Sequence, residues 1–214
     1  MEVVKSAWCR LARLLSPLPL DALMDMHTDM SQICITPPTI LAVTMGQAKR
    51  NLRVDDDDLD DLIEIWLQGI ISALEHEIGQ CVMEQTWEVT LDGFVDTIRL
   101  PHPVMSVESV SYLDADGVTQ ELEPSTWRLS RSRYWTDMEL AADSSWPATA
   151  CSGDAVTIRV ICGYGSTAES TPANIRLYIL AKLVEQFDPI TRAERDTVQS
   201  NFVSRLLDAC RTYQ

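Results

Sequence analysis

The most acidic stretch of the chain is a candidate cation site. It consists of the aspartate run Asp55–Asp58, with Asp60 and Asp61 close behind it. Calcium loops need carboxylates at alternate positions around a glycine turn, and this stretch contains no glycine. At the start of a helix, in contrast, carboxylates interact well with the free N–H groups of the first turn. We therefore expect a solvated helix N-terminus here, and no bound metal.

A second acidic segment, LDADGVTQELE (residues 113–123), resembles the start of a calcium loop. Its third acidic position and its terminal spacing do not fit that loop. The dipeptide Asp116–Gly117 is typical of hairpins with a two-residue loop. We therefore predict a type I′ turn between two strands.

The segment GYGSTA (residues 163–168) comes close to the glycine fingerprint of dinucleotide-binding proteins. That fingerprint requires a helix that starts within the motif, inside a β-α-β unit. Here the helix is expected only from Pro172 onwards, and no strand follows it. We therefore predict no cofactor at this segment.

The histidines and cysteines form no recognisable catalytic or metal-binding set. His76 lies between two glutamates on the polar side of an expected helix, and His102 lies between two prolines in an expected turn. Neither they nor His27 belong to a nucleophile–base motif. The cysteines contain no C-x-x-C pair: Cys9, Cys34, Cys81, Cys151, Cys162 and Cys210. We predict reduced thiols, no metal, no catalytic residue and no enzymatic activity.

The six tryptophans allow two interpretations. A row of them on one exposed sheet face would be a stacking platform for a sugar or a base. Large aromatic side chains more often fill cores and interfaces. We favour the core or interface role, and a carbohydrate-binding β module remains as an alternative.

Two helices are expected in the first half of the chain. Thr44 and Gln47 have the spacing of a capping box, which predicts a short helix over Met45–Leu52. Apolar residues recur at steps of three and four over Leu59–Ile78, which predicts a longer amphipathic helix. Gly79 is a natural C-cap for it.

The middle of the chain, residues 85–165, has the period of β-strands. Apolar and polar residues alternate in short runs that are separated by turn residues. The expected strands, about six, lie in the segments TWEVTL, TIRLP, VESVSYLD, ELEPSTWRLS, YWTDMELA and AVTIRVICGYG. Such a set forms a small antiparallel sheet, a sandwich or a barrel.

Helices are predicted again at residues 172–187 and 199–211. Pro172 is well placed at the start of the first one, and Pro189 lies just beyond its end. The predicted fold class is therefore α+β. A helical bundle is made by the N- and C-terminal helices, and an antiparallel β-rich insertion separates them.

The predicted domain organisation has two parts. Residues 1–40 form an N-terminal extension, and residues 41–214 form one domain whose first helices occupy residues 44–80. The segment ITPPTI (35–40) is predicted as an extended linker, because prolines disfavour helix and inner strand. Within the extension, residues 1–30 are either an ordered arm that packs on a partner, or else a flexible leader or a translation start placed too far upstream, with Met30 as the true start.

The overall composition excludes several classes of protein. The chain has 214 residues, 46% of them hydrophobic, and a net charge of −15. A sequence-independent nucleic-acid binder needs a basic face that displaces phosphate counterions, which this charge disfavours. No apolar run approaches the roughly 20 residues of a membrane helix, and we expect no membrane association.

The order of these motifs resembles the head–tail connector proteins (adaptor or head-completion proteins) of long-tailed bacteriophages and prophages. The matching segments are AKRNLRVDDDDLDDLI (48–63), QTWEVTLDGF (85–94), IRLPHPVMSVESVSYLDADG (98–117), SSWPA (144–148), GYG (163–165) and PANIRLYILAKLVEQF (172–187). Each segment alone is weak, and their order and spacing carry the resemblance. The extension at residues 1–40 falls outside it.

The resemblance implies a non-enzymatic virion protein without a cofactor, whose helical bundle carries a β insertion. About twelve copies would form a ring beneath the portal protein. The ring would extend the DNA channel, let genomic DNA pass without specific binding, and receive the next neck, stopper or tail protein. Its place would be the head–tail junction of the virion, and the host cytoplasm during assembly. A stopper or tail-completion protein of the same neck is the alternative.

C-termini of that family commonly contact the portal, so the resemblance places the candidate partner interface in the C-terminal helix and tail. The residues predicted for this contact are Phe202, Arg205, Leu206, Leu207, Arg211 and Tyr213. Deletion of residues 200–214 is expected to abolish portal binding and to leave the fold intact.

Overall fold

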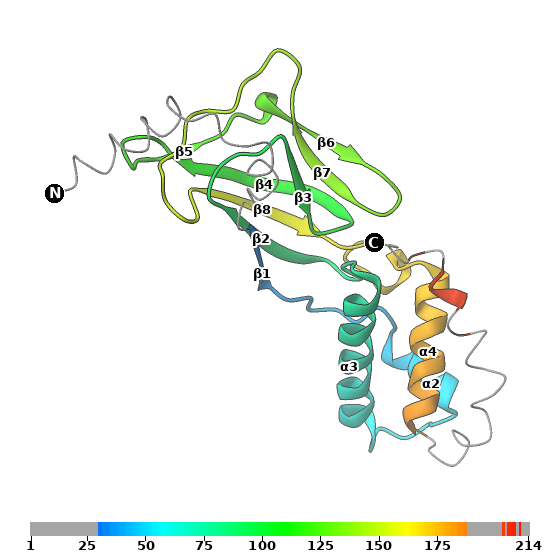
Figure 1. Cartoon of the computed structure of the whole chain (residues 1–214). Coiled ribbons are helices and arrows are strands. Elements are labelled where there is room, and N and C mark those ends of the chain that lie inside the picture. Colours follow the sequence, from blue (N-terminus) through cyan, green and yellow to red (C-terminus); the bar gives the residue numbers. More distant parts are fainter. Residues whose placement is uncertain (1–29, 188–202, 204, 209, 211–214) are drawn as a thin grey trace, which may run out of the picture.

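The computed structural model describes residues 30–187, 203, 205–208 and 210. These residues form a β-rich part and a layer of helices, and the helical layer lies at one end of the β-rich part (Figure 1). Helices precede and follow the strand-rich segment along the chain, which confirms the predicted α+β fold. No helix among these residues is long and apolar enough to cross a membrane.

The helical layer of the described chain consists of α2 (Met45–Leu52), α3 (Asp60–Ile78) and α4 (Ala173–Phe187). The capping box at the start of α2 is confirmed. The Gln47 backbone N–H donates to the Thr44 hydroxyl oxygen, and the Thr44 N–H donates to the Gln47 side chain. Gly79 ends α3 in the left-handed conformation with φ 66°, as predicted.

The long helix begins later than predicted. It starts at Asp60, with Leu59 at the N-cap, and Asp55–Asp58 lie in the turn between α2 and α3. The Nζ atom of Lys49 lies 2.5 Å from an oxygen of Asp57 and 2.9 Å from an oxygen of Asp60. These hydrogen bonds raise the pKa of Lys49. The ammonium group therefore holds the acidic turn against α2, which the run of aspartates alone did not reveal.

Each predicted strand segment contains an observed strand. They are β2 (Gln85–Leu91), β3 (Thr97–Leu100), β4 (Val104–Leu113), β6 (Trp127–Arg131), β7 (Thr136–Leu140) and β8 (Val156–Cys162). The structure adds β1 (Met30–Thr36) and β5 (Thr119–Glu121). One sheet has the strand order β1-β2-β8-β4-β5 and the other has the order β3-β7-β6, with antiparallel pairing throughout.

Strand β1 lies inside the region predicted as an N-terminal extension. It pairs with β2, with Met30 opposite Leu91 at one end and Thr36 opposite Thr86 at the other. Six of its residues are exposed and Cys34 is half-buried, so the strand adds little to the core, and its apolar Ile33 and Ile35 face outward. The structure therefore assigns residues 30–36 to the edge of the larger sheet.

The turn between β4 and β5 differs from the predicted type I′ turn. That type needs a positive φ at both central residues, and Gly117, with φ 79°, is the one residue of this turn that has it. The Gly117 N–H donates to the Asp114 carbonyl, and the N–H groups of Asp116 and Val118 donate to the Asp114 carboxylate at 3.0 Å. The Asp114 carboxylate and carbonyl therefore shape the turn.

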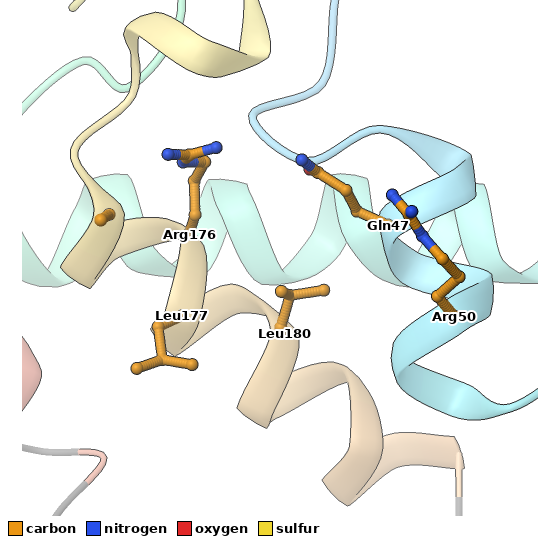
Figure 2. Close-up of a pocket in the computed structure, with 6 residues that line it drawn as sticks. Gln47, Arg50, Arg176, Leu177 and Leu180 are labelled. Atoms are coloured by element: carbon orange, nitrogen blue, oxygen red, sulfur yellow. The ribbon is translucent and has the colours of Figure 1, made fainter.

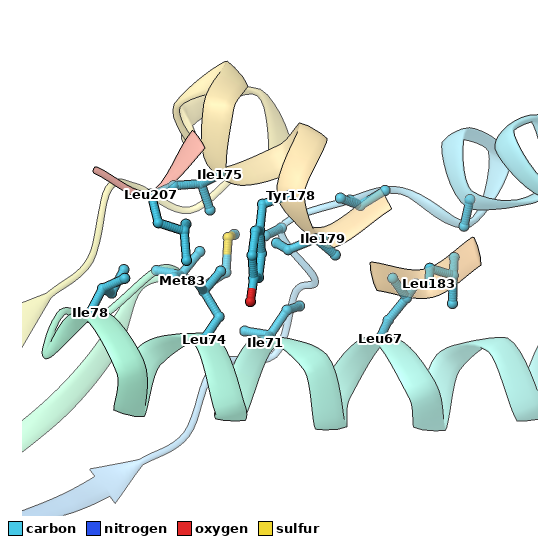
Figure 3. Packing of buried hydrophobic residues seen from close by; sticks show 14 of the residues in the cluster. Leu67, Ile71, Leu74, Ile78, Met83, Ile175, Tyr178, Ile179, Leu183 and Leu207 are labelled. Carbon is cyan, nitrogen blue, oxygen red and sulfur yellow. The ribbon is translucent and has the colours of Figure 1, made fainter. Parts of the chain in front are cut away.

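Two hydrophobic cores hold the structure together. In the first, the helices α3 and α4 face each other through Leu67, Ile71, Leu74, Ile175, Ile179 and Leu183 (Figure 3). The second lies between the two sheets and includes Val89, Val110, Ile158, Ile98, Leu100 and Met138. The β-rich part is therefore a two-sheet sandwich, one of the three forms predicted.

The two glycines of the GYG segment allow two backbone segments to pass each other closely. Gly163 has φ 127° and Gly165 has φ 150°. A Cβ atom on Gly163 would lie 2.4 Å from the carbonyl oxygen of Met83. The Glu84 N–H donates to the Gly165 carbonyl at 3.1 Å. The motif therefore has a structural role, and α4 begins after Pro172, as predicted.

Candidate partner-binding surfaces

Two amide side chains hold the C-terminal segment against the helical layer. Gln80 Nε2 donates to the Cys210 carbonyl at 2.7 Å, and Asn174 Nδ2 donates to the Leu206 carbonyl at 2.9 Å. The buried Gln80 also accepts a hydrogen bond from the Tyr164 hydroxyl at 2.7 Å. Burial raises the pKa of Tyr164 to about 12, so its hydroxyl remains a donor at neutral pH.

The structure describes half of the residues predicted to contact the portal. Arg205 is exposed, Leu206 is half-buried against the helical core, and Leu207 is fully buried within that core. The others lie outside the described residues: Phe202, Arg211 and Tyr213. Leu207 therefore anchors the segment, while Arg205 is available at the surface.

Two buried residues of this segment were absent from the prediction. Val203 and Cys210 pack in the helical core together with Leu207. Their spacing of four and three residues is the helical period that could have identified them. Deletion of residues 200–214 would therefore remove core packing as well as surface, so the truncation does not test partner contact by itself.

A groove of about 420 Å³ lies between α2 and α4 (Figure 2). Figure 2 shows α3 behind it, so the groove opens on the side of the helical layer that faces away from α3. Its lining consists of Gln47, Arg50, Ala173, Arg176, Leu177 and Leu180. Both charged residues are arginines, although the chain has a net charge of −15. We call this feature the α2–α4 groove; sequence analysis missed it because its two sides lie far apart in the chain.

The histidines were considered as catalytic candidates, and His102 contacts a strand residue. Its Nδ1 atom lies 3.0 Å from the Thr136 hydroxyl oxygen, and burial lowers the pKa of this histidine. His76 is exposed, while His27 lies outside the described residues. Within the described part of the chain, no three histidine, cysteine or acidic side chains gather as a metal ion would require.

The tryptophans of the described residues do not form a platform on one sheet face. Of the described tryptophans, Trp135 is exposed, and the guanidinium of Arg99 lies 5.3 Å from its ring centre. Trp146 is half-buried and stacks on Phe94, with ring centres 4.7 Å apart. The remaining described ones, Trp66, Trp87 and Trp127, pack against the two cores. The described surface therefore gives the carbohydrate-binding alternative no support.

Comparison with known proteins places this architecture among those of phage-like particles. Neither protein-family models nor curated proteins match the sequence. A chain in a virion of a native gene transfer agent (GTA) particle has a TM-score of 0.69 and 19% identity, with coverage of 86% of this chain and 96% of that chain. The two share a fold. A chain in a native GTA neck, computed with C12 symmetry, gives a TM-score of 0.62 at 19% identity, covering 87% of this chain and 96% of the other. A chain in an empty GTA neck, computed with C6 symmetry, gives 0.61 at 20% identity, with 74% and 83% covered.

In this chain, Glu75 near the end of α3 connects the helices to the sandwich. Its carboxylate accepts from the Val82 N–H at 2.6 Å and from Gln85 Nε2 at 2.9 Å. Gln85 in turn accepts from Trp87 Nε1 at 3.1 Å, in strand β2. This chain of hydrogen bonds fixes the start of the larger sheet relative to α3.

The position of Glu75 predicts a pH dependence of stability. Burial raises its pKa, and this effect exceeds the opposing hydrogen bonds from Val82 and Gln85. Because the folded state binds this proton more tightly than the unfolded chain, stability falls as pH rises from the unfolded pKa through the raised folded pKa. We expect the Glu75→Gln variant to lose this slope in urea unfolding between about pH 4 and pH 7. The exposed Glu64→Gln, on the same helix, is the control that should retain it.

Proposed function

We propose that this chain is a structural subunit of the neck of a phage-like particle, where it forms the head–tail adaptor ring that docks on the portal. The observation that carries this proposal is the similarity to the native GTA neck chain, which extends over 96% of that chain. Similarity over nearly a whole chain supports a common role for the entire fold. The C6 and C12 symmetries of those neck structures support a ring of copies for this chain as well.

In this role the ring extends the DNA channel and receives the next neck, stopper or tail protein. The net charge of −15 suits a conduit, because like charges keep the phosphates of a passing genome from binding. The subunit acts by shape and contact, without catalysis. Its location is the virion, after assembly in the host cytoplasm.

The proposal is tested by producing the full chain together with the portal protein of the same genome and imaging the complex by negative-stain electron microscopy. A ring of this protein stacked on the portal ring is the expected result. The absence of any complex would contradict the adaptor role. A ring that binds the tail-side neck protein but never the portal would assign the stopper position instead.

Within this proposal, Arg205 is predicted to contact the portal. Of the three described residues predicted for this contact it is the exposed one, and Asn174 and Gln80 hold the C-terminal segment in place. Reversing its charge with Arg205→Glu should weaken portal binding by about tenfold or more, since like-charge contacts across an interface cost several kcal/mol. Biolayer interferometry against immobilised portal measures the change.

The matched control for this substitution is Arg131→Glu. Arg131 is also exposed, and it ends β6 in the smaller sheet rather than belonging to the helical layer. It should bind the portal as the unchanged protein does. Equal binding by both variants would move the portal contact away from the C-terminal segment.

A further inference from the structure

The α2–α4 groove has the chemistry of a site for an acidic, partly apolar partner segment. Its charged lining residues are Arg50, which is exposed, and Arg176, which is half-buried. Arg176 Nε is shielded from solvent and has no hydrogen-bond partner among the described residues. Leu177 beside it is a large apolar side chain that is 46% exposed. An occupant that supplies carboxylates and apolar side chains would satisfy both features.

The outer face of α3 offers those groups. Its apolar residues Leu62 and Ile65 are 40% and 63% exposed, and the exposed Asp61 and Glu64 border them. Gly69, one turn further along, is also exposed, and a Cβ atom there would meet no atom within 4 Å. This face therefore combines apolar anchors, carboxylates and room for a close approach, as in helices that dock into grooves.

The two surfaces lie on opposite sides of one helical layer. The buried residues of α3, among them Leu67, Ile71 and Leu74, point toward α4 (Figure 3). The exposed Leu62 and Ile65 therefore point away from α4, while the α2–α4 groove opens on the far side from α3 (Figure 2). Complementary patches on opposite sides of a subunit are what a head-to-tail ring requires.

We propose that the outer face of α3 in one copy of this chain docks in the α2–α4 groove of the next copy. This inference rests on the proposed ring. Two strongly acidic subunits repel each other overall, so contact between Asp61 and Glu64 of one copy and Arg50 and Arg176 of the next supplies a local attraction. That pairing fixes which surfaces meet. Leu62 and Ile65 then cover the exposed Leu177.

Residues 1–29 are the competing occupant. Their sequence places Lys5, Arg10 and Arg13 among apolar residues, which suits the acidic face of α3. The same segment also carries Asp21, Asp25 and Asp29 among apolar residues, which suits the groove, but it joins the described chain at Met30, opposite Leu91 and so at the end of β2 away from α3. A second copy presents both a folded acidic face for the groove and a groove for that face, as a ring requires.

Charge exchange between two variants tests the docking. The face variant carries Asp61→Lys and Glu64→Lys, and the groove variant carries Arg50→Glu and Arg176→Glu. Each variant alone brings like charges together at every contact, whereas an equimolar mixture pairs opposite charges at every contact. Sedimentation velocity and negative-stain microscopy at about 50 mM salt, where screening is weak, follow self-association of the full chain.

We expect the unchanged protein to associate with rising concentration, each variant alone to associate at least about tenfold more weakly, and the mixture to recover association. Thermal unfolding followed by circular dichroism shows whether each variant is folded. If a double variant unfolds, Glu64→Lys and Arg50→Glu, both at exposed positions, replace it in the same design.

Three results would overturn the docking: variants that associate normally, a mixture that stays monomeric, or an unchanged protein that stays monomeric up to about 1 mM, which corresponds to an association free energy weaker than about −4 kcal/mol. Association that begins only after removal of residues 1–29 would assign those residues as the occupant instead. A ring that binds the portal but ignores the charge changes leaves the proposed function standing. Charge-dependent association without portal binding supports this interface and contradicts the adaptor role.

Discussion

Gly163→Ala is expected to lower the free energy of unfolding by about 3–5 kcal/mol, through steric overlap and backbone strain together. The new Cβ atom would lie 2.4 Å from the carbonyl oxygen of Met83 and 2.7 Å from the Glu84 nitrogen. Both are backbone atoms, so no side-chain rotation relieves the overlap. The residue also has φ 127°, which alanine rarely adopts. The strand β8 and the connection from α3 to β2 would have to separate at the junction of helices and sandwich.

Two other glycines provide matched controls for this substitution. Gly117 also has a positive φ, 79°, but no atom lies within 4 Å of an added Cβ, so Gly117→Ala should cost about 1 kcal/mol from strain alone. Gly69 lies inside α3 with the same open space, and Gly69→Ala should stabilise the chain by up to about 1 kcal/mol. Chemical denaturation measures all three. If Gly163→Ala costs no more than Gly117→Ala, the close approach to Met83 is wrong.

Local signals in the sequence predicted most of the elements. The capping box at Thr44 and the strand alternation from Trp87 to Leu91 depend on neighbours along the chain, and both were confirmed. The strands β1 and β5 were not predicted. Their residues are almost all exposed, so neither strand has the alternation of buried apolar and exposed polar residues that identifies a strand in a sequence. Pairing in the sheet, rather than local pattern, defines them.

Long-range contacts explain where local signals misled. The aspartate run was expected to open α3, but Lys49 in the preceding helix draws Asp57 into a turn. The Asp116–Gly117 pair was expected to form a type I′ turn, but the Asp114 carboxylate organises a different one. In both cases one side chain outside the motif decides the backbone conformation. Single-sequence propensity does not report such a partner.

The candidate surfaces also depend on long-range contacts that local sequence signals do not show. The resemblance to connector proteins drew attention to the C-terminal segment, but only the structure separates the buried Leu207 from the exposed Arg205. The α2–α4 groove joins Arg50, which precedes β2 in the sequence, to Arg176, which follows β8. Both arginines lie in segments that carry the resemblance, but nothing in those segments shows that the two side chains line one groove. Their importance comes from the absence of any acidic residue in the lining of that groove.

Gln80→Ala is the second substitution with a large expected effect, about 2–5 kcal/mol of lost stability. Gln80 is 4% exposed and connects three segments: α3 ends beside it, Tyr164 donates to it, and it donates to Cys210. Alanine would leave the Tyr164 hydroxyl and the Cys210 carbonyl without these partners in a buried place. Each unsatisfied buried group costs about 1–3 kcal/mol.

The loss should be local before it is global, and this distinguishes Gln80 from an ordinary core residue. With its carbonyl anchor gone, the segment around Val203, Leu207 and Cys210 should become sensitive to limited proteolysis under conditions where the sandwich resists. Gln68→Ala is the control, because Gln68 is exposed on α3 and bonds only to Glu64 at 3.2 Å among the described contacts. It should change stability by less than about 0.5 kcal/mol. If Gln80→Ala keeps the segment protected, core packing and the Asn174 hydrogen bond hold the C-terminal segment without Gln80, and portal contact through Arg205 would not depend on Gln80.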